Sequence, residues 1–227
     1  MARFSLQSPR VRNYLITFLV ILLIVAYSVY KSRVTEGLLQ GLASPEEQIR
    51  QTAALSLLAS DNLINATLDE PEWIRLNACN ALAKAEPNER TLDTLVKFCK
   101  DPSLRVRTAA GLTWGSFGME ALERSVKELG SGDANVRLQA VEAIKKIGSG
   151  AASQTLMAYK DSFEQDPIDW NQRIAAAQAL GGLKAEKAVK ELIAGLKDQN
   201  ATARVTARDS LVAIGVPSVE PDRKSVV

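Results

Sequence analysis

Residues 133–148 read DANVRLQAVEAIKKIG, and this stretch contains the pattern that decides the fold. Val136, Ala140 and Ile144 are spaced four residues apart around Arg137, so they share one face of a helix. The alanine in the middle of that face allows a close approach between helices, while the larger residues on either side fill the space between layers. A single helix of this kind cannot bury its apolar face, so the stretch predicts stacking against further copies.

The same arrangement recurs six times along the chain, with 25 to 36 residues between successive copies. The shared arginines are Arg50, Arg75, Arg107, Arg137, Arg173 and Arg204. Alanine stands three residues after each of them, at Ala53, Ala78, Ala110, Ala140, Ala176 and Ala207. A large apolar residue stands seven residues after each, at Leu57, Leu82, Trp114, Ile144, Leu180 and Leu211. The residue before the arginine is Ile49, Ile74, Val106 and Val136 in the first four copies, and Gln172 and Ala203 in the last two.

Each copy is preceded by a segment that we expect to form the first helix of a pair. These first helices are expected over residues 35–43, 62–69, 89–100, 119–129, 150–164 and 186–197. Glycines follow the second helices and suit C-caps, at Gly118, Gly148, Gly181 with Gly182, and Gly215. Asp133 and Asp169 suit N-caps. Together with Glu46, they are also the carboxylates expected to neutralise the row of arginines.

This (I/V)-R-x-x-A second helix, in a repeat of about 30 residues, resembles the HEAT repeat. It is similar in particular to the short HEAT-like repeat of phycobilisome lyases. The resemblance covers residues 35–215 and implies an all-α fold, a right-handed α-solenoid of about six helix pairs with the second helices on its inner face. It also implies that the six arginines are structural and link successive repeats. We assign 31–215 to the solenoid and 216–227, which holds two prolines, to a tail.

Residues 14–30 read YLITFLVILLIVAYSVY and contain no charged side chain. Seventeen residues make a helix of about 25 Å, close to the lower limit for crossing a hydrocarbon core of about 30 Å. The segment predicts one transmembrane helix that follows a basic segment over residues 1–13. Side chains suited to the lipid headgroup region flank it, namely Arg10, Arg12, Tyr14, Tyr27, Tyr30 and Lys31.

Two alternatives to an uncleaved anchor are a buried core helix and a signal peptide cleaved near Ala26-Tyr27-Ser28. The flanking bases favour an N-terminus in the cytoplasm, because three arginines precede the apolar run and two bases follow it. We therefore expect a single-pass protein of a bacterial inner membrane with the solenoid on the periplasmic side.

Composition removes several classes of function. The 227 residues include no histidine, which excludes histidine catalysis and histidine metal ligands. Cys79 and Cys99 are too few for a cysteine zinc site; we expect two buried residues, with a disulfide as the alternative. The first 33 residues carry five bases and no acid, which leaves 23 bases and 26 acids, a net charge of −3, for the rest. Such a body is a poor nucleic-acid binder. We expect no metal, no cofactor and no catalytic residue.

Four residues are the candidates for partner contact: Trp73, Trp170, Phe163 and Asp166. The two tryptophans precede the apolar face of their helices, where either an interface contact or packing on their own repeat would explain them. Phe163 and Asp166 belong to the insertion over residues 161–167, and insertions between repeats often contact partners.

The leading hypothesis is a non-catalytic scaffold or adaptor, an accessory subunit of a larger membrane complex, whose partners are protein subunits and the bilayer. The alternative is a membrane-bound chromophore lyase or lyase helper, which the repeat type alone suggests. A third possibility is a membrane receptor for a small ligand.

Overall fold

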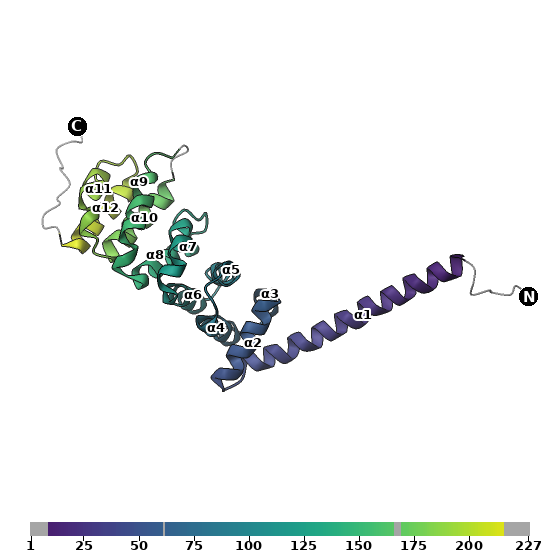
Figure 1. Ribbon diagram of the computed structural model, residues 1–227. Coiled ribbons are helices and arrows are strands. Elements are labelled where there is room, and N and C mark those ends of the chain that lie inside the picture. Colours follow the sequence, from purple (N-terminus) through teal and green to yellow (C-terminus); the bar gives the residue numbers. More distant parts are fainter. Residues whose placement is uncertain (1–8, 61, 166–168, 216–227) are drawn as a thin grey trace, which may run out of the picture.

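The computed structural model describes residues 9–60, 62–165 and 169–215, and all regular structure within these ranges is helical. Within these ranges, six helix pairs follow one another (Figure 1). The first helix of each pair is the C-terminal part of α1 (Pro9–Leu42), then α3 (Leu63–Thr67), α5 (Glu89–Phe98), α7 (Leu122–Glu128), α9 (Ala152–Asp161) and α11 (Val189–Gly195). The second helices are α2 (Glu47–Ala59), α4 (Glu72–Ala81), α6 (Leu104–Ser116), α8 (Ala134–Ile147), α10 (Trp170–Gly182) and α12 (Ala201–Ile214).

The second helices stack in order, from α2 to α12, and each also contacts the first helix of its own pair. Short 3-10 turns precede α7, α9 and α11, at Gly118–Ala121, Ser149–Ala151 and Glu186–Ala188, and a further one, Leu82–Lys84, follows α4. The result is the predicted solenoid of helix pairs, with the first helices along one side and the second helices along the other (Figure 1).

The predicted register of the second helices is confirmed. All six alanines three residues after the arginines are at most 3% exposed, and all six apolar residues seven after them are at most 1% exposed. The position before the arginine is buried in Ile74, Val106, Val136 and Ala203. Ile49 departs from the prediction, because it is 43% exposed at the first copy, where no earlier repeat covers it.

The ends of the helices follow the sequence in most places. Asp133 accepts hydrogen bonds from the backbone N–H of Asn135 and Val136, and Asp169 from those of Asn171 and Gln172, so both are N-caps as predicted. Gly148 and Gly215 are C-caps with positive φ. Gly181 and Gly182 are instead the last two residues of α10, which Leu183 caps, and a Cβ at Gly181 would come within 2.8 Å of the Ser210 backbone. The need for glycine at position 181 therefore comes from close packing against α12 and not from a C-cap.

The helix α1 is longer than the sequence analysis predicted. Instead of a membrane segment over 14–30 and a separate helix over 35–43, one uninterrupted helix of 34 residues runs from Pro9 to Leu42. Its last turns pack on α2: Leu42 is fully buried, and a Cβ at Gly41 would come within 2.9 Å of the Ala53 Cβ. Near the α2–α3 connection, the Asn62 side-chain amide donates to the Thr35 hydroxyl at 3.4 Å.

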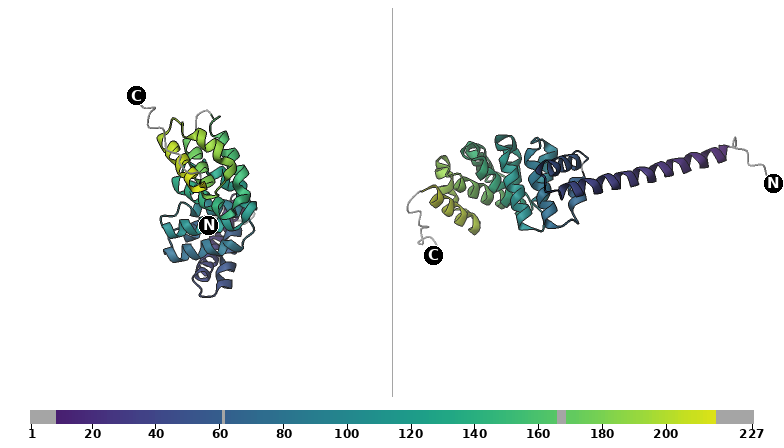
Figure 2. Two further views of the ribbon diagram at one scale, coloured as in Figure 1. Left: turned by 90° about the vertical axis from the view of Figure 1, so that its left-hand side faces the viewer. Right: turned by 90° about the horizontal axis from the view of Figure 1, so that it is seen from below.

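The N-terminal part of α1 projects away from the repeats (Figures 1 and 2). Every side chain from Thr17 to Val34 is exposed, including the apolar ones. The alternative of a buried core helix is therefore wrong. Residues Thr17–Leu42 are long and apolar enough to cross a membrane, although a signal sequence passes the same test.

Candidate functional site

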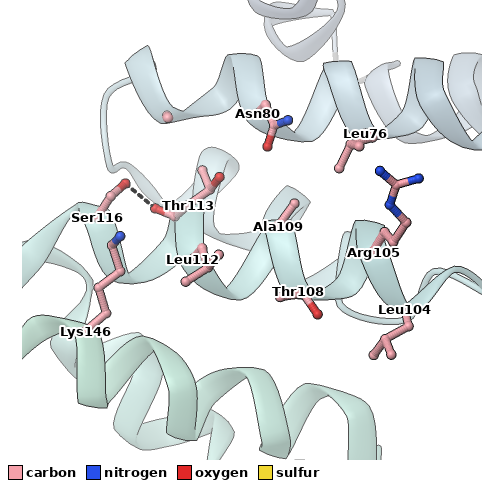
Figure 3. A pocket seen from close by; sticks show the side chains of 11 residues that line it. Leu76, Asn80, Leu104, Arg105, Thr108, Ala109, Leu112, Thr113, Ser116 and Lys146 are labelled. Carbon is pink, nitrogen blue, oxygen red and sulfur yellow. Dashed lines mark hydrogen bonds between the residues drawn. The ribbon is translucent and has the colours of Figure 1, made fainter.

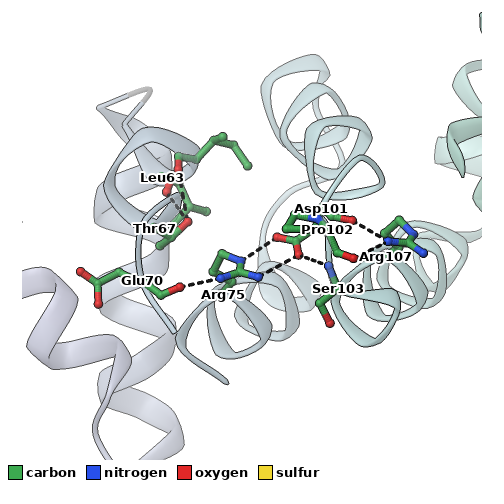
Figure 4. A network of polar contacts seen from close by, with 9 residues as sticks. Leu63, Thr67, Glu70, Arg75, Asp101, Pro102, Ser103 and Arg107 are labelled. Atoms are coloured by element: carbon green, nitrogen blue, oxygen red, sulfur yellow. Dashed lines mark hydrogen bonds and ion pairs between the residues drawn. The ribbon is translucent and has the colours of Figure 1, made fainter. Parts of the chain in front are cut away.

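Five of the six repeat arginines donate hydrogen bonds to backbone carbonyls in the turn before their own helix. The Arg107 guanidinium donates to the Asp101 and Pro102 carbonyl oxygens at 2.7 and 2.9 Å, six and five residues earlier in the chain (Figure 4). Arg50 and Arg204 make the same pair of contacts, Arg137 makes the contact six residues back, and Arg75 makes the one five residues back. These bonds satisfy backbone acceptors in the turns that precede five of the six second helices. Arg173 instead donates to Ser162 and Asp198.

Two of the six arginines also connect one helix pair to the next. Arg75 forms a two-bond ion pair with Asp101, at 2.8 and 3.0 Å, and this hydrogen-bonded carboxylate raises the pKa of Arg75 (Figure 4). Asp101 also accepts from the backbone N–H of Ser103 and offers its carbonyl to Arg107. In the C-terminal half, Arg173 pairs with Asp198 through a single bond. Asp198 likewise accepts from the backbone N–H of Asn200 and offers its carbonyl to Arg204. In both cases the ion pair joins a second helix to the turn that precedes the next second helix.

The carboxylates that pair with the arginines differ from the predicted ones. The carboxylates of Asp133 and Asp169 accept hydrogen bonds from backbone N–H groups at the start of their helices. The Glu46 side chain makes no such hydrogen bond to the start of α2. The carboxylates that do pair, Asp101 and Asp198, lie about 25 residues after their arginines. Such a pairing depends on the stacking of two repeats and has no local sequence signal.

Two aromatic candidates lie around Arg173. The Arg173 guanidinium carbon is 3.7 Å from the centre of the Phe163 ring and 4.9 Å from that of Trp170. Phe163 also meets the Tyr159 ring edge-on at 5.3 Å. Trp170 and Phe163 therefore pack against Arg173 of their own repeat. Phe163 is still 41% exposed, and a partner contact at either residue stays a prediction. Asp166 lies outside the described residues.

Trp73 stands apart from that cluster. It is 51% exposed at the start of α4. The prediction of a partner contact at Trp73 therefore stays open to test. Of the predicted headgroup residues, Tyr27, Tyr30 and Lys31 are exposed on α1, whereas the side chains of Arg10, Arg12 and Tyr14 lie outside the described ones.

Both cysteines are free and buried. Burial raises the pKa of the Cys79 thiol, and it raises that of Cys99 to about 12. Thiols in this state are poor nucleophiles. Among the described residues, no group of three or more cysteines and carboxylates could hold a metal ion.

An open groove of about 590 Å³ runs between α4 and α6 (Figure 3). Its apolar lining includes Leu76 from α4 and Ala109 and Leu112 from α6. Arg105 and Lys146 provide its charged lining residues. The periodic pattern of the repeats does not predict this groove. The feature of the sequence that could have indicated it is a leucine two positions from the buried alanine of a second helix, as in Leu76 and Leu112.

Two parts of the chain match models of known repeats. Residues 60–129 match the model described as HEAT repeats, and residues 172–198 match the PBS lyase HEAT-like repeat. These matches identify HEAT-like repeats in both halves of the solenoid. No curated protein matches the chain.

Solved structures that match include two designed armadillo repeat proteins. One, YIII(Dq.V1)4CPAF in complex with the peptide (KR)4, is 21% identical over 78% of this chain and 98% of that chain, with a TM-score of 0.34. The other, YIII(Dq)4CqI, is 20% identical over 78% of this chain and 98% of that chain, with a TM-score of 0.30.

Proposed function

We propose that this protein is a non-catalytic scaffold, anchored in a membrane by α1, that holds protein subunits of a larger membrane complex on its solenoid. The observation that carries the proposal is the continuity of α1. One helix begins as an exposed apolar segment and ends as a packed part of the first repeat. A solenoid of HEAT-like repeats supplies the surface for protein contact, because stacking uses only the flanks of each repeat.

A continuous helix gives the scaffold a specific mechanical property. Fewer than two turns separate Tyr30 at the end of the apolar run from Thr35, which already contacts the solenoid through Asn62. No flexible linker lies between the two, so the bilayer would fix the height and the tilt of the solenoid. Anchoring also raises the effective concentration of the solenoid near other membrane proteins.

The experiment compares the full chain with two shortened variants. A variant that begins at Val34 keeps the packed turns of α1, and we expect it to leave the membrane fraction and to unfold cooperatively with high helix content. A variant that begins at Ser44 also lacks Leu38, Leu39 and Leu42, and it should be clearly less stable because these side chains pack in the core. Retention of the Val34 variant in the membrane would refute anchoring by α1.

Partners and orientation need separate measurements. Purification of the full chain in a mild detergent should recover a defined set of membrane subunits in constant ratio, and recovery of the chain alone would contradict the scaffold role. For orientation, we propose a cytoplasmic N-terminus and a periplasmic solenoid in a bacterial inner membrane. Protease added to spheroplasts should then digest the solenoid, whereas protection until lysis would reverse the orientation. The lyase alternative rests on the repeat type alone, and we do not propose it.

A further inference from the structure

We propose that the groove between α4 and α6 binds an amphipathic helix of a partner protein that carries carboxylates beside its apolar face. This inference rests on the proposed function, because it names the kind of partner that the scaffold would hold.

The groove lies on the free side of the second helices. Leu76 is two residues before the buried Ala78, and Leu112 is two residues after the buried Ala110. Two residues turn an α-helix by about 200°, so both leucines lie on the other side of their helix from the buried alanine. Leu76 is partly buried against the edge of the core. Leu112 remains 49% exposed and Leu104, at the start of α6, 60% exposed. Figure 3 shows the side chains of Leu76 and Ala109 facing each other between the two helices. The floor is therefore apolar surface that the chain covers only in part.

The charged residues at the groove determine which charge a bound partner segment must carry. Arg105 and Lys146 both line it, and no carboxylate does. Glu72 contacts Arg105 from outside the lining at 3.4 Å, but both side chains are well exposed, so a carboxylate of a partner can compete for the guanidinium. The adjacent Lys145 is already paired with Glu142 at 2.7 Å. An acidic segment therefore complements this surface, and a basic one is repelled.

The spacing of the two cations sets the length of the partner segment. Lys146 lies beside Gly115, where a Cβ would come within 2.8 Å of the Lys146 Cβ. Gly115 follows Arg105 by ten residues of α6, which corresponds to about 15 Å along the helix. A partner helix of about three turns spans that distance, with a carboxylate near each end.

The hydrogen-bonding capacity of the groove favours a helix over an extended strand. An extended segment of about 15 Å contains roughly five residues and brings about ten backbone donors and acceptors. Six polar side chains line the groove, fewer than these ten backbone groups, and the Ser116 hydroxyl already donates to the Thr113 carbonyl at 2.6 Å. A helix satisfies its own backbone and needs only apolar contact and charge pairing.

The test uses the full chain in zwitterionic lipid nanodiscs and a fluorescein-labelled helical peptide of 14 residues. The peptide carries leucine on one face and glutamate beside that face near each end, and a second peptide has lysine in place of glutamate. We expect fluorescence anisotropy, corrected with empty nanodiscs, to show at least tenfold tighter binding of the glutamate peptide. The double variant Arg105→Glu with Lys146→Glu should reverse the preference. Leu112→Ala should weaken binding of the glutamate peptide at least fivefold.

A matched variant and two outcomes keep the test decisive. Lys97→Glu with Lys160→Glu changes the same charge on the first helices and should leave both affinities unchanged. Equal affinity for the two peptides, or no binding of either, would overturn the proposal. Self-association that Leu112→Ala abolishes, without peptide binding, would assign the groove to a second copy and overturn it as well. Peptide binding does not require membrane retention, so a failure to bind the peptide does not contradict the membrane-anchored scaffold. A chain that binds the peptide but is not retained in the membrane contradicts only the anchoring.

Discussion

Arg173 forms an ion pair with Asp198, 25 residues further along the chain, and the two side chains are 4% and 0% exposed. The guanidinium also donates to the Ser162 hydroxyl at 3.2 Å and to the Ser162 carbonyl, so it connects the insertion, the fifth second helix and the turn before α12. The Asp198 carboxylate in turn accepts from the backbone N–H of Asn200 at 2.7 Å. The buried guanidinium of Arg173 thus bonds to residues 11 positions before it and 25 positions after it in the chain.

The first prediction concerns this pair. Arg173→Met should lower the free energy of unfolding by about 3–5 kcal/mol, because it leaves the Asp198 carboxylate buried without its counter-charge. Adding Asp198→Asn should restore part of that loss. The matched variant Arg105→Met removes an exposed pair with Glu72 and should cost less than about 1 kcal/mol. Equal midpoints in urea for Arg173→Met and Arg105→Met would contradict the buried link.

A second prediction tests how α1 meets α2. Gly37 and Gly41 are one turn apart in α1, but a Cβ at Gly37 meets nothing within 4 Å, whereas one at Gly41 comes within 2.9 Å of the Ala53 Cβ. Gly37→Ala should therefore raise stability by up to about 1 kcal/mol through helix propensity alone. Gly41→Ala should lower the melting temperature in detergent, because the clash with α2 outweighs the same gain. If both variants melt at higher temperature, the close contact between α1 and α2 is wrong.

The repeat could be predicted from sequence because its information is local and periodic. Ala140 and Ile144 recur at the same spacing in six copies, and helix geometry alone places them on one face. The continuity of α1 was missed for a physical reason. The charges after Tyr30 end the apolar run, but Lys31, Arg33 and Glu36 are all compatible with a helix, so a change of polarity was mistaken for a break.

The contacts between repeats could not be predicted in the same way. The pairing of Arg75 with Asp101 requires two neighbouring repeats to be stacked. A similar separation recurs between Arg173 and Asp198, but nothing in the sequence close to either arginine indicates its partner. The groove is a similar case. Leu76 and Leu112 look like ordinary exposed leucines in sequence, and only the packing of α4 beside α6 brings them together.

A third prediction concerns the two thiols. Cys79 and Cys99 are buried with raised pKa values, so at pH 8 the native protein should not react with DTNB, and both thiols should react once urea unfolds it. A variant Ala83→Cys, at an exposed position of the groove, should react at once and serves as the control. Rapid labelling of the unmodified native chain would contradict the burial of both residues.

The raised pKa of Cys99 also makes the stability of the protein depend on pH in alkaline solution. The pKa of Cys99 rises from 9.0 to about 12 on folding, so its neutral form is the one that the folded state favours. Its contribution to stability is complete below pH 9, and it is lost as the pH rises through about 12. The urea midpoint should therefore fall over this range, and Cys99→Ala should fall less steeply. Parallel curves for the two proteins would contradict the shift.

The last prediction separates the two tryptophans that precede an apolar helix face. Trp170 packs against Arg173, so Trp170→Ala should lower the melting temperature of the solenoid. Trp73 is 51% exposed, so its removal should leave the melting temperature unchanged. An exposed tryptophan that contributes little to folding can still be an interface anchor, and truncation of such an anchor weakens association by about 2 kcal/mol or more, roughly thirtyfold. Melting temperature and retention of co-purified subunits are to be measured on the same preparations. If Trp73→Ala retains its subunits as well as the unmodified protein does, Trp73 is not a partner contact. The surface that holds the partners must then lie elsewhere on the solenoid.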